Sequence, residues 1–320
     1  MLKQAMGVSH AKVILIGEHS VVYQKPAIAL PLPAVKTTAK ITPLNNGQQR
    51  FASRYYSGPR QTAPIELEGI NALIDTLLAR FHAIDSAFEL KIHSDLPAER
   101  GMGSSAATAV AIIRALYQAF GQPLTHEQLR ADADISEHII HGNPSGLDVA
   151  TTSADAAVWF HKGEDPVDLP FHLTSYLVVA DSGIHGQTGL AVKHVADFKE
   201  AHNRLATHAI NHLGALTEAA RDALLKNDVL HLGQVLNRAQ AELRTLGVSH
   251  PRLDQMIQVA RQNGAVGAKL TGGGMGGCII ALAKTAKDAA KITTALKQMN
   301  ILETWTQPFL SEEVVYDDAN

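Results

Sequence analysis

Hydrophobic and polar residues alternate along this chain with two different periods, and each period predicts a different kind of element. Short apolar runs and strict alternation predict strands, whereas apolar residues that recur every three to four positions predict helices. Strands are expected at 11–16, 35–41, 88–93, 156–160, 176–180 and 303–309. Helices are expected at 70–81, 106–120, 125–141 and 285–299. The first half of the chain is therefore predicted to mix strands with helices.

The second half of the chain has a different pattern. Residues 190–262 are rich in alanine and leucine and predict a mostly helical run. Breaks in that run are expected near Gly214, near Asn227 and at 247–251. Residues 45–60 are polar and carry glycine and proline, which predicts a weakly structured surface segment. The change of composition near 169–175 predicts two domains, 1–172 and a helix-rich 173–320.

The composition narrows the class of protein. The chain has 320 residues, of which 46% are hydrophobic and 18% charged, and its formal net charge is -3. That charge, with 5% aromatic residues, argues against a nucleic-acid-binding module, which needs a basic surface and stacking platforms. Cys278 is the only cysteine, so an intramolecular disulfide and a cysteine-based zinc site are excluded. The first apolar run, 13–16, is too short for a membrane span, and we expect a cytoplasmic protein.

A glycine-rich segment at 100–107 stands between a predicted strand and a long predicted helix. Gly101 and Gly103 allow the backbone to turn tightly and to lie close to a ligand. Ser104 or Ser105 could cap the helix that follows, and the free N–H groups and dipole at a helix N-terminus suit a phosphate. The alternative is a glycine-rich turn before a capped helix, without a ligand.

Phosphoryl transfer requires a phosphate cradle, a divalent metal, a cation and a group that orients the attacking hydroxyl. Ser105 and Glu137 offer oxygen ligands for Mg²⁺, Lys12 offers the cation, and Asp148 offers a carboxylate on a turn rich in glycine and proline. Each has a simpler alternative. Lys12 could be a solvated strand end, Glu137 could form a surface pair with His141, and Asp148 could cap the next helix.

Other features have two interpretations as well. The glycines at 272–277 could form a second nucleotide loop, but a supporting role is preferred because one ATP needs one cradle. Cys278 lies in an apolar run and is expected to be an inert buried thiol. The segment 181–183 could reach the site or form a plain turn. Four histidines are expected on helix surfaces: His194, His202, His208 and His212.

Three stretches, 12–23, 96–107 and 269–282, together resemble the GHMP small-molecule kinases and occur in that family's order. They read Lys-Val-Ile-Leu-Ile-Gly-Glu-His-Ser-Val-Val-Tyr, Leu-Pro-Ala-Glu-Arg-Gly-Met-Gly-Ser-Ser-Ala-Ala and Lys-Leu-Thr-Gly-Gly-Gly-Met-Gly-Gly-Cys-Ile-Ile-Ala-Leu. Within the family, residues 137–148 are most similar to the members that phosphorylate mevalonate, and the bacterial type is expected.

The resemblance implies an α+β fold, with a ribosomal-protein-S5-like N-terminal domain that binds ATP and Mg²⁺ and a ferredoxin-like C-terminal domain. It implies ATP-dependent phosphorylation of the primary hydroxyl of mevalonate and a possible homodimer. From the composition and the apolar runs, we expect no nucleic-acid or membrane partner. The implied catalytic residues are Asp148 and Lys12, and the implied Mg²⁺ ligands are Ser105 and Glu137. The implied phosphate loop consists of Gly101, Met102, Gly103, Ser104, Ser105 and Ala106. The implied mevalonate-binding residues are Glu18, His19 and Thr188, and 272–277 would support the site.

Overall fold

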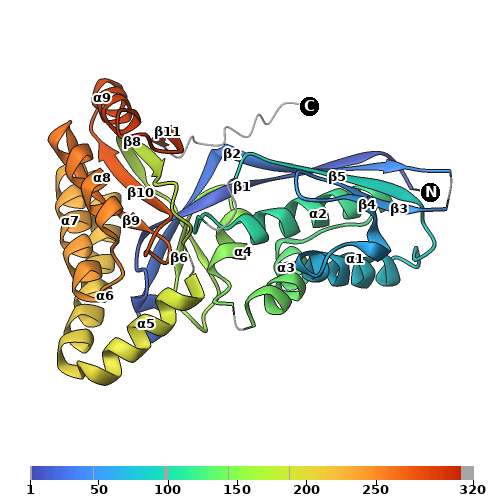
Figure 1. Ribbon diagram of the computed structural model, residues 1–320, viewed down its shortest axis with the longest axis horizontal. Helices are drawn as coiled ribbons and strands as arrows, with labels where there is room; N and C mark the ends of the chain where they lie inside the picture. The colour runs from blue at the N-terminus through green and yellow to red at the C-terminus, as the bar shows by residue number, and fades with distance from the viewer. Residues whose placement is uncertain (1, 46, 97–99, 143, 187, 311–320) are drawn as a thin grey trace.

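Two β-sheets, one toward each end of an elongated molecule, organise the fold (Figure 1). The computed structural model describes residues 2–45, 47–96, 100–142, 144–186 and 188–310. Its strands are β1 (Ala5–Ile16), β2 (Ala27–Pro43), β3 (Gln49–Ala52), β4 (Ser57–Pro59), β5 (Phe88–Ser94), β6 (Ala157–Phe160), β7 (Val167–Leu169), β8 (His172–Asp181), β9 (Ala265–Thr271), β10 (Cys278–Ala283) and β11 (Glu303–Leu310). Its α-helices are α1 (Glu68–Arg80), α2 (Ser104–Phe120), α3 (His126–His141), α4 (Leu147–Thr152), α5 (Thr188–Ala201), α6 (Asn203–Leu225), α7 (Val229–Thr245), α8 (Pro251–Gln262) and α9 (Ala286–Lys297).

The first sheet is built around the long strand β2. The sheet has the order β4-β3-β5-β2-β6-β7, and β1 pairs with β2 outside this path. The pairing of β3 with β5 is parallel, and the other pairings described in this sheet are antiparallel. Helix α2 packs on β1 and β2, and α1 and α3 lie on the same side of the sheet (Figure 1). This arrangement brings the end of β1 close to the start of α2.

The second sheet has the order β11-β8-β10-β9, and all its described pairings are antiparallel. Along the chain its elements follow β-α-β-β-α-β, with α5 to α8 between the first two strands, which is the ferredoxin-like connectivity. Helices α7 and α8 pack on β9, and α9 packs on β8. The predicted α+β class is therefore confirmed. The division into 1–172 and 173–320 stays a proposal, which the start of the second sheet at β8 supports.

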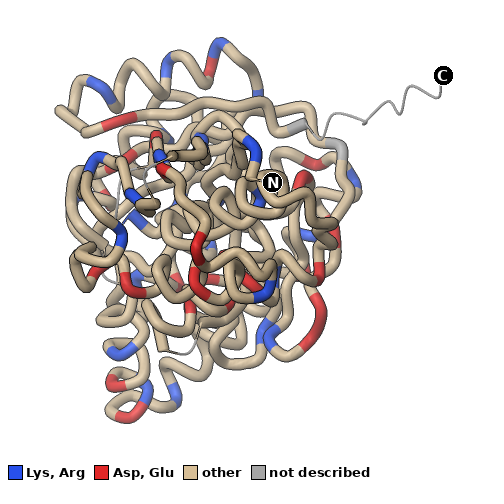
Figure 2. Tube along the Cα trace, turned by 90° about the vertical axis from the view of Figure 1, so that its right-hand side faces the viewer, with Lys and Arg blue, Asp and Glu red and all other residues tan. Residues whose placement is uncertain are grey.

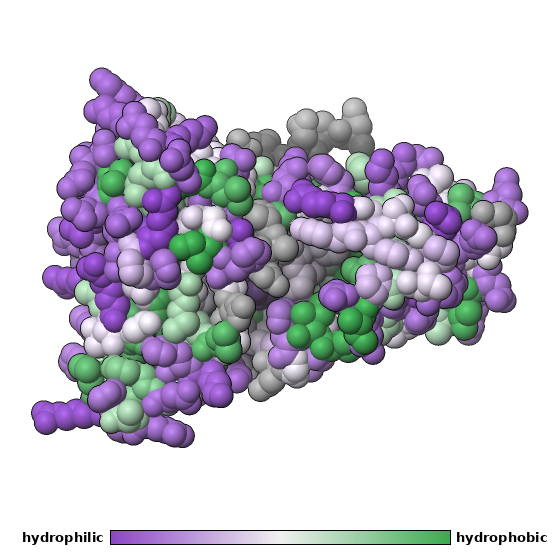
Figure 3. Space-filling model, viewed as in Figure 1, coloured by the Kyte–Doolittle hydropathy of each residue, from purple (hydrophilic) through white to green (hydrophobic). Residues whose placement is uncertain are grey.

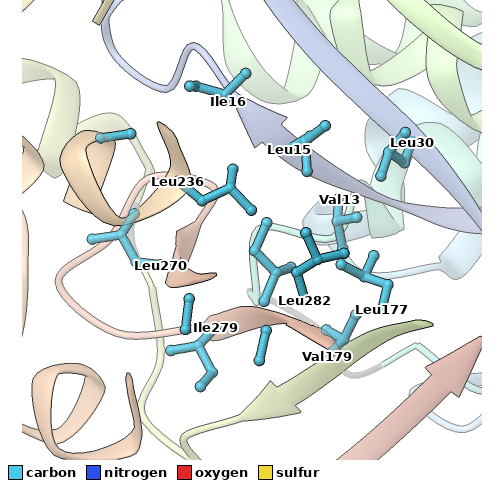
Figure 4. Packing of buried hydrophobic residues seen from close by; sticks show 14 of the residues in the cluster. Val13, Leu15, Ile16, Leu30, Leu177, Val179, Leu236, Leu270, Ile279 and Leu282 are labelled. Atoms are coloured by element: carbon cyan, nitrogen blue, oxygen red, sulfur yellow. The ribbon is translucent and has the colours of Figure 1, made fainter. Parts of the chain in front are cut away.

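The two sheets share one hydrophobic core, which Figure 4 shows from close by. Val13 and Leu15 of β1 belong to the same buried cluster as Leu177 of β8 and Leu282 of β10, and all four side chains are 0% exposed. Helix α7 adds Leu236 to this cluster. Because burial of apolar surface is the main force that stabilises folds, the shared core holds the two halves against each other.

Residues 45–60 differ from the prediction, because this segment carries β3 and β4 rather than a weakly structured excursion. Phe51 is 1% exposed and packs into the core beneath the first sheet, and β3 pairs with β5. These strands could not be recognised from the polar composition of the segment. They are short and lie toward the edge of the sheet, where one face of a strand stays polar.

The break predicted near Gly214 is also absent, because α6 continues through this residue. A Cβ atom at Gly214 would lie 2.9 Å from Cδ of Lys25. The glycine therefore makes room for the Lys25 side chain against the helix and does not end it. The breaks near Asn227 and at 247–251 are confirmed by the ends of α6 and α7.

Charges of both signs are interspersed along the trace (Figure 2). On the face drawn in Figure 3, hydrophobic residues form separate patches between hydrophilic ones. No helix in the described part of the chain is long and apolar enough to cross a membrane.

Candidate active site

A cavity of about 460 Å³ is lined by residues from both halves of the chain. Its lining includes most of the predicted site residues: Lys12, Glu18, His19, Gly101, Glu137, Asp148 and Thr188. It also includes Gly272 and Gly273 of the second glycine-rich segment. The tertiary structure thus brings together residues that the sequence pattern could only propose one at a time.

Lys12 and Asp148 form an ion pair on one wall of the cavity, with 2.7 Å between Nζ and Oδ1. Lys12 is 2% exposed, so it is not a solvated strand end. Its backbone N–H donates to the carbonyl of Met102 at 3.0 Å, which joins β1 to the glycine loop. The Asp148 side chain is 38% exposed and pairs with Lys12, while the N-cap of α4, Gly146, has no side-chain cap. The capping interpretation of Asp148 is therefore wrong.

The glycine loop ends in a left-handed residue that begins α2. Gly103 occupies the N-cap position with φ of 72°, and no side chain caps this helix. The predicted serine cap is therefore wrong, because Ser104 already lies inside the first turn. A Cβ atom at Gly103 would lie 3.0 Å from Cγ of Lys12, so glycine also permits the close approach of the lysine. The first N–H groups of α2 therefore have no side-chain cap, a feature that suits an anionic ligand.

The two glycine-rich segments touch each other through their backbones. A Cβ atom at Gly101 would lie 3.3 Å from Cα of Gly272, and a Cβ atom at Gly272 would lie 3.1 Å from Cα of Gly101. Both residues have positive φ angles, which side chains rarely adopt. The second segment therefore lies against the first, in agreement with a supporting role.

An ion pair between Arg100 and Asp181 holds the start of the glycine loop. Nε of Arg100 donates to Oδ2 of Asp181 at 2.9 Å, and Asp181 is 0% exposed. The other Asp181 oxygen accepts a hydrogen bond from the N–H of Gly183 at 2.9 Å. Residues 181–183 are absent from the cavity lining and form a turn, in which the Asp181 side chain accepts the bond from Gly183 and also anchors the glycine loop to β8.

Two residues of the predicted phosphate loop point into the core. Met102 is 1% exposed and Ala106 is 0% exposed, so they can offer a nucleotide only backbone atoms. Sδ of Met102 lies 3.6 Å from Sγ of Cys278. The Cys278 thiol is buried, which raises its pKa well above the ordinary value and agrees with the predicted inert thiol.

Glu137 is a buried carboxylate with an unsatisfied oxygen. Its side chain is 2% exposed, and Oε1 has no hydrogen-bond partner among the described residues. Oε2 lies 3.7 Å from Nε2 of His141, which is 3.2 Å from Oγ of Ser105. Burial raises the pKa of Glu137, and the negative charge of Asp148 raises it further, whereas Ser105 and His141 act in the opposite direction. An orphaned buried oxygen of this kind is costly unless a ligand satisfies it.

The donor set of Glu137 and Ser105 fits Mg²⁺. This cation prefers oxygen ligands and is commonly held by one or two protein groups, with water and phosphate oxygens completing its shell. No group of three or more His, Cys, Asp or Glu side chains in the described segments could hold a metal. A site formed jointly with a nucleotide phosphate needs no such group.

Glu18 forms a buried ion pair that the sequence analysis missed. Glu18 is 1% exposed, and its Oε1 accepts a hydrogen bond from Nζ of Lys269, which is 0% exposed. Burial raises the pKa of Glu18 and lowers that of Lys269, and the ion pair opposes both shifts. The available signal was a lysine inside the otherwise apolar run that precedes the second glycine-rich segment.

His19 lies next to this pair, and its ring is neutral. Nε2 donates to the carbonyl of Gly273 at 2.9 Å. The pKa of His19 is lowered to about 4, chiefly by burial. The carbonyl of Gly273 acts in the opposite direction, and positive charge on Lys269 and His194 adds to the lowering. His194 is not a surface residue as predicted, because its Nε2 is buried without a partner among the described residues.

Thr188 and Lys162 are two further polar residues that line the cavity and could bind a ligand. Thr188 begins α5 and is exposed, and a Cβ atom at Gly273 would lie 2.9 Å from its Cα. Lys162 follows β6, and nothing in the sequence marks it, because a lysine in a polar turn is ordinary.

Comparison with known proteins places these features in a family. The profile of the GHMP kinases N terminal domain matches residues 69–155, and that of the GHMP kinases C terminal matches residues 220–302. A mevalonate kinase of Aeropyrum pernix is 32% identical over 295 residues, covering 89% of this chain and 90% of that protein. The crystal structure of mevalonate kinase from methicillin-resistant Staphylococcus aureus has a TM-score of 0.73 and 32% identity, covering 96% of this chain and 99% of that one. The structure of L. major mevalonate kinase in complex with R-mevalonate has a TM-score of 0.81 and 29% identity, covering 97% of this chain and 100% of that one.

The lowered pKa of His19 predicts a pH dependence of folding stability. The unfolded chain binds a proton at this residue below its ordinary pKa of 6.5, whereas the folded protein does so only near pH 4. Stability is therefore full above pH 6.5 and decreases as the pH falls toward 4. Between pH 7.5 and 5, His19 should contribute a loss of about 2 kcal/mol in the free energy of unfolding.

Denaturant unfolding at both pH values checks this expectation by comparing the unchanged protein with His19→Gln. The loss on acidification should be about 2 kcal/mol smaller in His19→Gln. The exposed His208 provides the matched control, His208→Gln, which should retain the full loss. Equal losses in all three proteins would contradict the burial of a neutral His19.

Proposed function

This chain belongs to the GHMP kinase family, and from that premise we propose that it transfers the γ-phosphoryl group of ATP to the primary hydroxyl of mevalonate. The observation that carries the proposal is the Lys12–Asp148 ion pair, which lines the same cavity as Gly101 of the glycine loop and the unsatisfied Glu137. Relatives that cover most of this chain and carry the name mevalonate kinase support this acceptor.

The glycine loop and the N-terminus of α2 would bind the triphosphate of ATP. Backbone N–H groups at a helix N-terminus attract phosphate oxygens, and the close approach of Gly101 and Gly272 keeps the loop in shape. Ser105 and Glu137 would hold Mg²⁺. When bound, that ion neutralises charge on the β- and γ-phosphates.

Asp148 and Lys12 would act on the acceptor hydroxyl. The exposed part of the Asp148 carboxylate would accept the hydroxyl hydrogen bond and orient the oxygen toward the γ-phosphate. The Lys12 ammonium would stabilise negative charge that develops on that oxygen and on the transferring group. Because this transition state is loose, positioning and charge neutralisation are expected to supply most of the acceleration.

The remaining lining residues would recognise mevalonate itself. Glu18, His19 and Thr188 offer polar groups at the cavity wall, as the family resemblance implies. Lys162 would pair with the carboxylate of mevalonate, because the other lysine of the lining, Lys12, is already paired with Asp148. A bacterial type of this kinase, a cytoplasmic location and a homodimer belong to the proposal as well. The Staphylococcus aureus structure, at 32% identity, supports the bacterial type. The archaeal mevalonate kinase of Aeropyrum pernix has the same identity to this chain.

An assay of ADP release identifies the acceptor. Mevalonate, phosphomevalonate, galactose and homoserine are supplied in turn with Mg·ATP, and turnover of mevalonate should exceed that of the others by about 100-fold or more. Turnover of another acceptor would retain the phosphoryl chemistry but reject the assigned acceptor pocket. ATP binding without turnover of any acceptor would instead favour a non-catalytic ATP sensor.

Substitution of Asp148 tests the residue that orients the hydroxyl. Asp148→Asn keeps the size and one hydrogen bond to Lys12 but removes the carboxylate charge, so kcat should fall about 100-fold or more. The affinity for an ATP analogue should change by less than about three-fold, since Asp148 is assigned to the acceptor. The exposed Asp222 on α6 offers the control Asp222→Asn, with unchanged kcat. A rate for Asp148→Asn near that of the control would show that the assignment is wrong.

Substitution of Glu137 tests the proposed metal ligands. Glu137→Gln removes the charged oxygen that would hold Mg²⁺, so the Mg²⁺ concentration for half-maximal activity should rise about ten-fold or more. Glu127→Gln, an exposed change in the first turn of the same helix, is the matched control. Identical Mg²⁺ titrations for the two variants would remove Glu137 from the metal site.

A further inference from the structure

Lys269 lies directly behind the cavity wall and has no assigned role. It is absent from the cavity lining, but its ammonium group donates to Glu18, which lines the cavity. The same ammonium group donates to the carbonyl of Leu270 at 2.6 Å. Lys269 is 0% exposed, so its position is set entirely by these contacts and by the packing around β9.

Only one of the two carboxylate oxygens of Glu18 accepts a hydrogen bond from a described residue. Oε1 is bonded to Lys269, whereas Oε2 is buried and has no hydrogen-bond partner among the described residues. Two apolar residues would fill this volume at a lower desolvation cost than an ion pair. Glu18 lines the cavity, and a ligand there that donates a hydrogen bond to Oε2 would explain why this buried oxygen has no protein partner among the described residues.

We propose that Lys269 is a positioning residue for the acceptor. Its ammonium group orients the Glu18 carboxylate so that Oε2 accepts a hydrogen bond from a hydroxyl group of the bound acceptor. This inference rests on the proposed kinase function, since it assigns the acceptor, and not ATP, to Glu18. Lys269 does not touch the acceptor itself.

The surroundings of Lys269 explain how the second glycine-rich segment can act on the acceptor pocket. Thr271, two residues later, accepts a hydrogen bond from the N–H of Ile14 at 2.9 Å and donates to the carbonyl of Ile14 at 3.0 Å. These bonds fix the end of β9 against β1, the strand that carries Lys12. They hold Lys269 at a fixed position behind the cavity wall, where its ammonium group reaches Glu18.

Lys269→Met tests the proposal by separating the two substrates. Removing the ammonium leaves the Glu18 carboxylate without the group that orients it, which weakens the hydrogen bond between Glu18 and the acceptor. The KM for mevalonate should therefore rise about ten-fold or more. The KM for ATP should stay within about two-fold. Lys287→Met, an exposed lysine on α9, is the matched control and should leave both KM values unchanged. A parallel rise of both KM values in Lys269→Met would indicate a purely structural lysine and overturn the proposal.

The pH profile supplies a readout that a structural role would not change. Burial raises the pKa of Glu18, and the positive charges of Lys269 and Lys12 act in the opposite direction. Loss of Lys269 should therefore raise this pKa further. The kcat/KM for mevalonate of the variant should therefore increase as the pH rises from 6 to 9, relative to the unchanged protein. Parallel profiles for the two proteins would contradict the proposal.

A paired variant covers the case in which Lys269→Met does not fold. Glu18→Gln/Lys269→Met leaves no buried charge unpaired, and it is compared with Glu18→Gln alone. Because Lys269 acts only through Glu18, the two should have equal KM values for mevalonate, and a further ten-fold loss in the paired variant would overturn the inference. Absence of mevalonate turnover by the unchanged protein would contradict the proposed function instead, which distinguishes the two failures.

Discussion

The close approach of two backbones at Gly101 and Gly272 is the constraint on which the site depends. A Cβ atom on either residue would lie within 3.3 Å of the other backbone, so neither position can accept a side chain without moving the two segments apart. One segment leads into α2 in the first half of the chain, and the other joins β9 to β10 in the second half. The cavity lies where they meet and receives residues from both halves.

Charged groups surround this contact in pairs. Among the described residues, Lys12 pairs with Asp148, Arg100 pairs with Asp181, and Glu18 pairs with Lys269. Ion pairs of this kind contribute little net stability, because desolvation of the charges offsets their attraction. Their value here is geometric. The first presents a carboxylate to the cavity, the second anchors the glycine loop, and the third leaves one carboxylate oxygen available to a ligand.

The sequence predicted the chemistry better than it predicted the local geometry. The sequence predicts a glycine loop before a helix at Gly101 and Gly103, and the structure confirms that context, but the N-cap position is occupied by Gly103 rather than by a serine. Lys12 and Asp148 were both chosen from the sequence, yet their pairing joins β1 to α4 across more than one hundred positions and no periodicity contains it. The sequence does not predict the roles of Lys162 and Lys269, because a lysine is recognised as functional only once the group that it faces is known.

The amino-acid sequence by itself determined the order and type of most elements, because hydrophobic periodicity and glycine position act locally along the chain. It also determined which residue types were available for phosphoryl transfer. Only the tertiary structure decided which of them share a cavity, which carboxylate oxygens lack a partner and which lysines are buried. Those properties depend on packing between the two sheets, and neighbours in that packing are distant in the sequence.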